Sequence, residues 1–491
     1  MKKKLLFRAD GNSEIGLGHL YRLLSLLDMF KDDYDVIFVT RADSVLEVIP
    51  PHYLTKIIPQ QISLEEEVNW ISKFFKPKDC VLIADGYQFD SLYQKKLKQK
   101  EFYLIYIDDL ATEYMYADVV VNHSPFVKET DFKTELYTKF LLGVDFAMLR
   151  PAFLKAAKEK NTIGSIKNAF VCFGGADKYD LTLRAAQALL NINSIENINI
   201  ILGGAYKHKD ILLLEKDNNK IHLHKNLDED MLCGLMKSSQ IAIAPSSTIL
   251  YELCCVKMPI LSGYYAENQK SIYKGLAEKD IIIEGGNFTN YTVSDFEEKI
   301  KTILGSNHLN IFLEKQQNLF RGNSKTNFLG LINKLNISLR KAKAEDILEV
   351  YNWSNDTLVR KNSYDSSPIK LEDHKKWFSR KIEDRNTLFL IALVNNKPAG
   401  IVRFDINDTH SLVGVLLSKN YRGQKLASEF LKKSARIYFK TNTQPILAYI
   451  KKENKASIKV FENARYISFK EEVIKGCTSF VYKLEEKDVR R

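Results

Sequence analysis

The stretch "LLFRADGNSEIGLGHLYRLLSLLDMF", residues 5–30, joins a short apolar run to a helix-length segment through a glycine-rich turn. Leu5–Phe7 is typical of a buried parallel strand, and the residues from Leu20 onward are typical of a helix. The stretch therefore predicts a strand, a turn and a helix, in that order. In open α/β sheets, ligands bind at the carboxyl ends of the strands, which is where this turn falls.

The same alternation of short apolar runs and longer mixed segments continues along the chain. It predicts a doubly wound, Rossmann-like lobe over residues 1–154 and a second one over residues 155–335, which begins with a polar stretch and closes with helices. Two α/β halves joined by a short linker predict a cleft between them. The predicted strands after the first lie at 36–40, 80–85, 102–109, 118–122, 168–175, 198–204, 221–224, 240–245 and 258–263.

The chain changes character at residues 336–346. The apolar runs 388–396, 398–407 and 410–418 follow one another closely, as the strands of an antiparallel meander do. Residues 336–491 are therefore expected to form a smaller, mixed α/β domain.

The net charge and the cysteine content of the chain indicate which kinds of ligand and which cellular compartment to expect. The chain has 491 residues, a net charge of +11 and six cysteines without a CxxC pair. Its lysines are spread along the sequence, which favours a solvated surface over a nucleic-acid site and suits anionic small molecules such as nucleotides. The start "MKKKLLF" is too short in apolar residues for a signal peptide, and no run approaches the roughly 20 residues of a membrane span. We therefore expect a cytoplasmic protein with reduced thiols, without a nucleic-acid or membrane partner and with no evident protein partner.

The glycine-rich turn also carries residues suited to chemistry. Gly16 and Gly18 would let the backbone approach a ligand closely, and His19, at the predicted helix start, can accept a proton from water near neutral pH. Three charged residues lie in or beside the same turn: Arg8, Asp10 and Arg22. The alternative is a turn that simply needs glycine, with His19 on the surface. The clustering of charged groups favours a functional site.

The run "RADGNSEIGLGHLYR", residues 8–22, resembles the signature of the UDP-sugar hydrolases of pseudaminic acid biosynthesis. The resemblance continues in order over about residues 1–330, through "ADGYQFD" (84–90), "IDDLA" (107–111), "VVNHSP" (120–125), "LLGVDFAMLRPAF" (141–153), "CFGGADKYDLT" (172–182), "APSSTILYEL" (244–253) and "ENQ" (267–269). It implies a two-lobed, glycosyltransferase-B-like fold and removal of UDP from 2,4-diacetamido-2,4,6-trideoxy-β-L-altropyranose. Because this region has no HExxH or comparable Cys/His spacing, no metal is expected.

The resemblance also implies a role for each matching residue. His19 would act on the attacking water, and Asp10 would orient that water or contact the sugar. Tyr87 would line the sugar pocket, and Asn268 would contact substrate near the reacting centre. The implied substrate-binding residues are Arg8, Gly18, Arg22, Tyr87, Asn268 and Gln269.

The second lobe would hold the nucleotide. The run Ser246-Ser247-Thr248 precedes a predicted helix and offers hydroxyl and N–H groups to a diphosphate, whose charge the helix end would stabilise. Glu252, on the next turn, either grips the ribose hydroxyls, as an acid does in related folds, or is a helix-surface acid. Gly174 and Gly175 lie at another predicted strand end. The family usually has a glycine where this chain has Pro245-Ser246.

The segment "KNYRGQKLASEFLKKS", residues 419–434, resembles in part the Q/R-x-x-G-x-G/A turn of the GNAT acetyltransferases. The resemblance implies that backbone N–H groups of this turn hold the pyrophosphate of acetyl-CoA at a helix N-terminus. The implied acetyl-CoA-binding residues are Arg422, Gly423, Gln424, Lys425, Leu426, Ala427 and, in the partly matching segment 453–469, Asn454. Lys425 stands where the family has a glycine, and Phe461 stands where it has the tyrosine that protonates the departing thiolate.

Two further features of this domain leave alternatives open. Tyr364, Tyr449 and Tyr466 are candidates for the missing acid, although a packed aromatic ring is the more common reason for such a residue. The segments 352–364 and 372–378 resemble the acceptor-side region of aminosugar N-acetyltransferases. Their tryptophans, Trp353 and Trp377, fit a hydrophobic core equally well.

Together the two resemblances imply a bifunctional nucleotide-sugar enzyme. The C-terminal domain would acetylate the 4-amino group of UDP-4-amino-4,6-dideoxy-2-acetamido-β-L-altrose with acetyl-CoA, and the N-terminal unit would hydrolyse the product with inversion. The alternatives are a UDP-sugar glycosyltransferase, a hydrolase of the legionaminic acid type with a gluco-configured substrate, and a non-catalytic UDP-sugar sensor. The sequence does not separate the sugar stereoisomers, because that choice rests on pocket shape.

Overall fold

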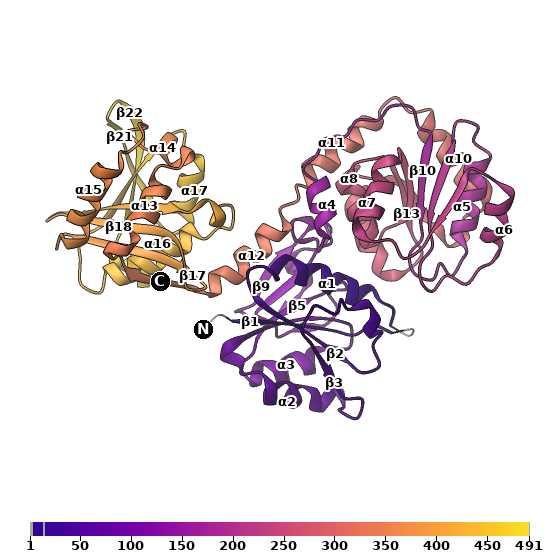
Figure 1. Ribbon diagram of the computed structural model, residues 1–491, viewed down its shortest axis with the longest axis horizontal. Helices are drawn as coiled ribbons and strands as arrows, with labels where there is room; N and C mark the ends of the chain where they lie inside the picture. Colours follow the sequence, from indigo (N-terminus) through magenta and orange to yellow (C-terminus); the bar gives the residue numbers. More distant parts are fainter. Residues whose placement is uncertain (1–2, 13–14, 491) are drawn as a thin grey trace. The chain divides into compact units, whose positions relative to one another are not determined.

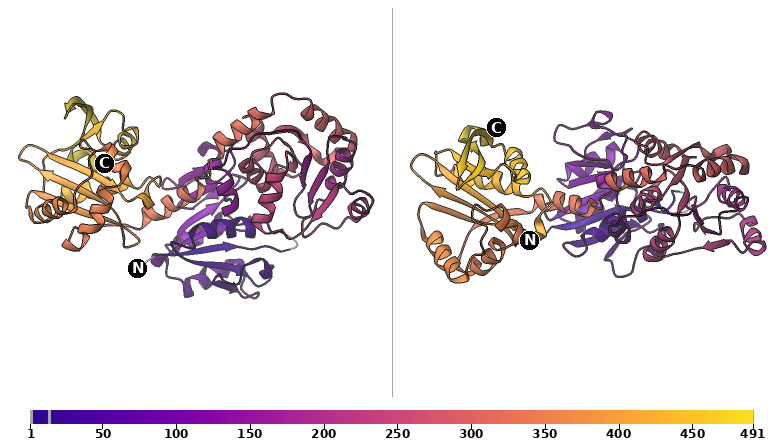
Figure 2. Two further views of the ribbon diagram at one scale, coloured as in Figure 1. Left: turned by 45° about the horizontal axis from the view of Figure 1, so that its top comes forward. Right: turned by 90° about the horizontal axis from the view of Figure 1, so that it is seen from above.

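The computed structural model describes residues 3–12 and 15–490, and it divides into two compact units at Lys325/Thr326. The first unit contains two large parallel sheets and the second contains one mixed sheet (Figures 1 and 2). The division falls at the start of α12 (Ser324–Leu335). Most of α12 groups with the C-terminal unit because Gly330 packs against the backbone of Gln424 with no room for a Cβ atom, and Asn333 donates to the Gln424 side chain at 2.6 Å.

The first lobe is a parallel sheet in the order β3-β2-β1-β4-β5-β7-β9, which confirms the predicted fold class. Helix α1 (Gly18–Phe30) covers one face, and α2 (Leu64–Phe74) and α3 (Ser91–Gln99) cover the other (Figure 1). Strand order reverses between β1 and β4, so the turns that follow these two strands flank the point at which such sheets bind ligands. The strands are β1 (Lys4–Ala9), β2 (Asp35–Arg41), β3 (Thr55–Ile58), β4 (Cys80–Asp85), β5 (Tyr103–Ile107), β7 (Val119–Asn122) and β9 (Lys139–Leu142).

The second lobe repeats this plan, with the strand order β12-β11-β10-β13-β14-β15 and every pair parallel. The order reverses between β10 and β13, whose apolar residues are buried because helices cover both faces of the sheet. The strands are β10 (Asn168–Cys172), β11 (Asn197–Ile201), β12 (Ile221–His224), β13 (Ile241–Pro245), β14 (Ile260–Tyr264) and β15 (Ile283–Asn287). The helices are α4 (Pro151–Ala156), which leads in from the first lobe, α5 (Leu181–Leu190), α6 (Asp210–Asp217), α7 (Glu229–Ser238), α8 (Thr248–Val256), α9 (Lys270–Ala277), α10 (Val293–Leu304) and α11 (Leu309–Leu319).

The C-terminal unit is a mixed sheet in the order β16-β17-β18-β19-β20-β22-β21. Strands β17, β18 and β19 form the predicted antiparallel meander. Strands β19 and β20 are parallel, but they pair only at Ser411–Leu412 with Ile446–Leu447, so the later residues of each strand lack the other as a partner. The strands are β16 (Ile337–Lys341), β17 (Thr387–Val394), β18 (Lys397–Ile406), β19 (Ser411–Leu417), β20 (Ile446–Lys451), β21 (Ile467–Ile474) and β22 (Cys477–Leu484).

Helices cover both faces of this sheet and form two separate cores. Phe430 and Phe461 belong to the core under α16 and α17, whereas Val350 and Phe378 belong to the core under α13 and α15. The helices are α13 (Ile347–Ser354), α14 (Thr357–Asn362), α15 (Leu371–Glu383), α16 (Ala427–Tyr438), α17 (Lys455–Asn463) and α18 (Glu486–Arg490). Within residues 3–12 and 15–490, no helix combines the length and hydropathy of a membrane span.

Candidate functional site

The carboxyl end of the first-lobe sheet holds a buried histidine–aspartate pair. Strands β1 and β4 are neighbours with Ala9 opposite Asp85, so the turn after β1 and the last residue of β4 lie together. His19, in the first turn of α1, places its Nδ1 atom 2.8 Å from Oδ1 of Asp85. Asp85 is fully buried and His19 is 8% exposed. Because the carboxylate favours a proton on Nδ1, Nε2 is the ring nitrogen left to accept a proton from a ligand or water.

Arg22 lies one turn beyond His19 on α1 and pairs with two carboxylates at this end of the sheet. It donates to the two carboxylate oxygens of Asp85 at 2.7 and 2.6 Å and to Asp109, which follows β5, at 2.6 Å. Burial opposes ionisation of both carboxyls, but Arg22 holds the pKa of Asp85 and of Asp109 below the usual value. Nη2 of Arg22 also lies 3.2 Å from Nδ1 of His19, so Arg22 holds the histidine–aspartate pair in place, and its contact with substrate stays a prediction.

Tyr87 and Asn268 lie beside His19 and come from different lobes. Tyr87 is 49% exposed, and its ring meets the His19 ring edge-on with 4.8 Å between centroids. The Tyr87 hydroxyl lies 3.4 Å from Oδ2 of Asp109 and 3.4 Å from Nδ2 of the exposed Asn268. Gly18, the first residue of α1, is also exposed. These three residues leave polar atoms open to a ligand next to the histidine.

Arg8 and Asp10 hold the fold, which corrects the roles predicted for them. Arg8 is fully buried, donates to Glu67 at 2.6 and 2.9 Å and forms an ion pair with both oxygens of Asp10. Asp10 also accepts the N–H of Arg41 at 2.9 Å and the side-chain amide of Gln88 at 3.1 Å. Burial opposes ionisation of Asp10, and Arg8 holds its pKa below the usual value. A carboxylate engaged in this way anchors the turn after β1 rather than orienting a water molecule.

Asp85 and His123 are candidate functional residues that the sequence analysis did not identify. Asp85 ends the run "CVLIAD", and an acid directly after a buried strand next to β1 was an available signal. His123 follows β7 and is 3% exposed, and its Nδ1 has no hydrogen-bond partner among the described residues. Burial, reinforced by the charge of Arg22, lowers the pKa of His123 to about 4. This second histidine is therefore neutral near pH 7.

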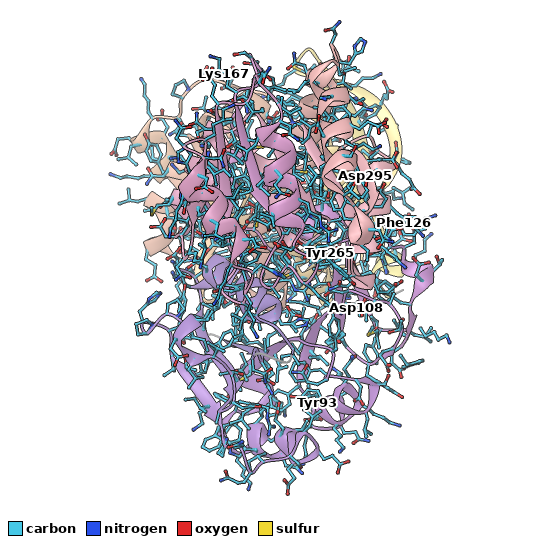
Figure 3. The ribbon with its side chains drawn as sticks, turned by 90° about the vertical axis from the view of Figure 1, so that its right-hand side faces the viewer. Tyr93, Asp108, Phe126, Lys167, Tyr265 and Asp295 are labelled. Atoms are coloured by element: carbon cyan, nitrogen blue, oxygen red, sulfur yellow. The ribbon has the colours of Figure 1, made fainter. Side chains whose placement is uncertain are left out.

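In the second lobe, glycines lie near the point where the strand order reverses, between β10 and β13. Gly174, two residues after the end of β10, has a φ of +81°, a conformation that favours glycine. Gly203 packs against the carbonyl oxygens of Gly174 and Gly175 with no room for a Cβ atom. Figure 3 shows Tyr265 of this lobe and Asp108 of the first lobe at the edges where the two lobes face each other. Tyr265 donates from its hydroxyl to the carbonyl of Phe173 at 2.7 Å and so anchors this region.

The run Ser246-Ser247-Thr248, at the start of α8, has fewer hydroxyl groups available to a ligand than predicted. Ser247 is the N-cap of α8, and both it and Thr248 are partly exposed. Ser246 is fully buried, its hydroxyl lies 2.9 Å from that of Ser262, and its N–H donates to Gly263 at 2.8 Å. The prediction that Ser246 binds nucleotide is therefore corrected, because both of its polar groups are used inside the lobe.

Two other predicted ligand contacts are internal. Glu252 is 5% exposed and accepts hydrogen bonds from Nε and Nη2 of Arg150 at 2.8 and 2.7 Å. It is thus neither an exposed acid nor free to grip a ribose, and burial raises its pKa despite Arg150. Gln269 is 7% exposed and accepts the N–H of Tyr265 at 2.9 Å, so it holds a turn, and its contact with substrate stays a prediction.

In the C-terminal unit, the turn before α16 has its own unusual backbone. Gly423 and Lys425 are exposed and have φ values of +79° and +56°, so Lys425 adopts a left-handed conformation that favours glycine. The buried Gln424 side chain donates to the carbonyl of Asn420 at 3.0 Å and fixes the turn from inside. Leu426 is fully buried, and α16 begins at Ala427. The turn offers backbone groups, together with the charge of Lys425, at a helix N-terminus.

The other predicted residues of this unit differ in burial and in hydrogen-bond partners. Asn454 caps α17 by accepting the N–H of Ser457 at 3.1 Å through Oδ1, and its contact with acetyl-CoA stays a prediction. Tyr466 is 3% exposed, whereas Tyr364 donates to Ser479 at 2.7 Å and Tyr449 is half-buried on β20. Trp353 and Trp377 both pack against the core under α13 and α15, in agreement with the core alternative.

In the described part of the chain, no cluster of three or more His, Cys, Asp or Glu residues has the geometry to hold a metal ion.

Comparisons with known proteins agree with this division of the chain. Residues 336–466 match the family model described as "Acetyltransferase (GNAT) domain". An uncharacterised protein of Methanocaldococcus jannaschii is 25% identical over 94% of this chain and 96% of its own length. The UDP-2,4-diacetamido-2,4,6-trideoxy-beta-L-altropyranose hydrolase of Campylobacter jejuni is 25% identical over 57% of this chain and 98% of its own length. The spore coat polysaccharide biosynthesis protein SpsG of Bacillus subtilis is 24% identical over 57% of this chain and 82% of its own length. The chain thus carries a C-terminal GNAT domain after a region homologous to the hydrolase and SpsG.

Proposed function

We propose that this chain, in which a GNAT domain follows a region homologous to a UDP-sugar hydrolase, catalyses two consecutive steps of pseudaminic acid biosynthesis. The C-terminal unit acetylates the 4-amino group of UDP-4-amino-4,6-dideoxy-2-acetamido-β-L-altrose. The N-terminal unit then hydrolyses UDP-2,4-diacetamido-2,4,6-trideoxy-β-L-altropyranose to UDP and the free sugar. The observation that carries the hydrolase proposal is the 2.8 Å contact between His19 and Asp85 at the point where strand order reverses.

In this proposal His19 is the general base. Its Nε2 atom takes a proton from a water molecule as the water oxygen attacks the anomeric carbon, and the bond from that carbon to the β-phosphate oxygen breaks with its electron pair leaving on UDP. Asp85 stabilises the imidazolium that forms, and Arg22 keeps Asp85 anionic. A single displacement without a covalent intermediate inverts the anomeric configuration, and this route requires no metal.

The leaving group is proposed to bind the second lobe. Gly174 and Gly175 offer an open backbone, and Ser247 and Thr248 offer hydroxyls at the N-terminus of the nine-residue helix α8. The helix dipole favours negative charge there, so it stabilises the diphosphate as the bond breaks. Tyr87 and Asn268 are proposed to contact the sugar beside His19.

Acetyl-CoA fits the turn before α16. The exposed backbone of Gly423 and Lys425, both at positive φ, precedes the N-terminus of the twelve-residue helix α16, which suits a pyrophosphate. Acetyl-CoA supplies the acetyl group as a thioester. The unpaired lengths of β19 and β20 offer backbone donors and acceptors next to this turn.

The test uses the purified full-length protein and both UDP-sugars. We expect acetyl-CoA to convert the 4-amino sugar to the diacetamido sugar, and water alone to release UDP from that product, with NMR showing the inverted anomer first. UDP release that requires a second sugar would identify a glycosyltransferase instead. Binding of the UDP-sugar without turnover would identify a sensor. Turnover of the gluco-configured isomer alone would place the chain in the legionaminic acid route.

A further inference from the structure

Residues 355–369, here called the 355–369 segment, connect α13 to α15. The first and last residues of this segment are hydrogen-bonded to each other. Nδ2 of Asn355 donates to the carbonyl of Ile369 at 3.0 Å, and the N–H of Ile369 donates back to Oδ1 of Asn355 at 2.8 Å. The short helix α14 forms the first part of the segment. Because the two ends are tied together, contacts made elsewhere along the segment govern the position of the whole.

One end of the segment contacts the turn before α16. Asp356 caps α14 by accepting the N–H groups of Leu358 at 3.0 Å and Val359 at 3.3 Å, and it also accepts a hydrogen bond from Nη1 of Arg422 at 2.8 Å. Nε of Arg422 donates to the carbonyl of Leu417, at the end of β19, at 3.2 Å. The Nη2 atom of Arg422 is buried without a hydrogen-bond partner in the described part of the chain. Loss of Asp356 would leave further donors of this guanidinium unpaired, which is costly where water is excluded.

The middle of the segment, at Ser363 and Tyr364, contacts the sheet where β20 has no pairing with β19. Lys451, the last residue of β20, donates from Nζ to the carbonyl of Ser363 at 2.6 Å, and its ammonium lies 5.7 Å from the centroid of the Tyr364 ring. The Tyr364 hydroxyl donates to the fully buried Ser479 on β22 at 2.7 Å. The 355–369 segment therefore runs from the turn before α16 to the face formed by β20 and β22.

We propose that Asp356 is a positioning residue that couples acetyl-CoA binding at the turn before α16 to the order of the 355–369 segment. The inference rests on the proposed acetyl-CoA site. A ligand that fixes the turn also fixes Arg422, and the ion pair with Asp356 fixes the N-terminus of α14. The segment is then held against β20 and β22. The coupling is reciprocal, so whatever orders the segment also tightens the binding of acetyl-CoA.

Amide hydrogen exchange of the full-length protein, with and without coenzyme A, measures this coupling. The test variant is Asp356→Asn, because asparagine caps a helix as well as aspartate does but lacks the charge for Arg422. The matched control is Asp346→Asn. Asp346 accepts a bidentate pair from Arg340 at 2.6 and 2.7 Å and the N–H of Lys343 at 2.8 Å, and neither of these partners lies in the turn before α16.

In the wild-type protein and in Asp346→Asn, we expect coenzyme A to slow exchange in residues 355–369 by about tenfold. In Asp356→Asn, at a coenzyme A concentration that still protects residues 422–427, we expect less than about a twofold effect on the segment. Unchanged exchange in β17 and β18 without ligand shows that each variant is folded. Wild-type protection of the turn without protection of the segment, or an equal effect in Asp356→Asn, would overturn the coupling. Failure of coenzyme A to protect the turn in the wild-type protein would instead overturn the proposed acetyl-CoA site.

Discussion

Nδ1 of His19 lies 2.8 Å from Oδ1 of Asp85, although the two residues are 66 positions apart in the chain. One comes from the turn after β1 and the other from the end of β4, and Arg22 donates to both oxygens of the same carboxylate. This arrangement orients the imidazole and keeps its partner charged, which are the two conditions that a histidine base requires.

Replacing either member of the pair is expected to stop hydrolysis but not acetyl transfer. His19→Ala removes the proposed base, and Asp85→Asn removes the charge proposed to stabilise its imidazolium. Each should lower the rate of UDP release by about 10²–10⁴-fold. Because the two residues act as a unit, the double variant should be no slower than His19→Ala alone. Rates of UDP release and of acetylation, measured on the same preparations, check both parts.

The matched control for this prediction is Asp118→Asn. Asp118 is also a carboxylate of the first lobe, paired with Lys98 at 2.5 Å, but it lies outside the site. Its hydrolysis rate should stay within about twofold of the wild-type rate. Additive losses in the double variant, with all proteins folded, would separate Asp85 from the action of His19.

His123 is expected to make the stability of the first unit depend on pH. Burial lowers its pKa from 6.5 to about 4, so between these pH values the unfolded chain binds a proton that the folded protein does not. The free energy of unfolding therefore falls as pH drops through this window, by about 2 kcal/mol at pH 4.5. His123→Gln should lose this part of the pH dependence, whereas Gln at the exposed His52 should not. The free energy of unfolding of each variant is measured by urea denaturation at pH 7 and at pH 4.5. An equal loss of unfolding free energy between these pH values in the two variants would contradict the prediction.

Lys257 is expected to be a structural lysine. It is 1% exposed, and its ammonium donates to the carbonyl groups of Ala156, Glu159 and Cys255 at 2.7, 2.6 and 2.9 Å. Lys257→Met keeps the apolar stem but leaves these carbonyls without their donor, which should cost about 2–4 kcal/mol of unfolding free energy. Lys237→Met, at a partly exposed lysine that also contacts Glu159, should change it by less than about 0.5 kcal/mol. Equal thermal midpoints for the two variants would rule out this role.

Two helical glycines of the second lobe should respond oppositely to alanine. A Cβ atom on Gly275, in α9, would lie 2.6 Å from Cγ of Pro125 and 2.8 Å from the backbone nitrogen of Phe126. Gly275→Ala should therefore destabilise the protein by about 1–3 kcal/mol. Gly234, in α7, is exposed, and no atom of the described residues lies within 4 Å of the added Cβ, so Gly234→Ala should stabilise the protein by about 0.5–1 kcal/mol. If the denaturation midpoints of Gly275→Ala and Gly234→Ala moved in the same direction, the close approach of Gly275 to Pro125 and Phe126 would be contradicted.

Two fragments produced separately, divided at the start of α12, are each expected to be active. Residues 1–323 should release UDP from the diacetamido sugar without acetyl-CoA, and residues 324–491 should acetylate the 4-amino sugar and leave UDP attached. A fragment of residues 336–491 lacks α12, including the Asn333 hydrogen bond to Gln424, so it should unfold at a lower temperature than 324–491. Loss of hydrolysis in 1–323, despite a folded fragment, would mean that the two activities are not independent.

The pattern of apolar runs was sufficient to predict the sheets, because a parallel strand covered on both faces must be apolar along its length. The runs 80–85 and 221–224 coincide with β4 and β12, and the meander of β17, β18 and β19 also follows the prediction. Ordered motifs of the same stretches further indicated a hydrolase-like region before a GNAT domain. This much depends on residues close together in the chain, and the sequence by itself determined it.

Which polar side chains remain available to a ligand was decided by the tertiary structure alone. The sequence singles out Arg8 and Asp10 but not Asp85. Folding pairs Arg8 with Glu67, engages Asp10 with Arg8 and Arg41, and brings Asp85 to His19. The physical reason is that a buried charge must find a partner, and its partner comes from whichever strand end lies next to it in the sheet. Local spacing does not specify strand order, so the pairing of Arg8 with Glu67 and of His19 with Asp85 became known only from the folded chain.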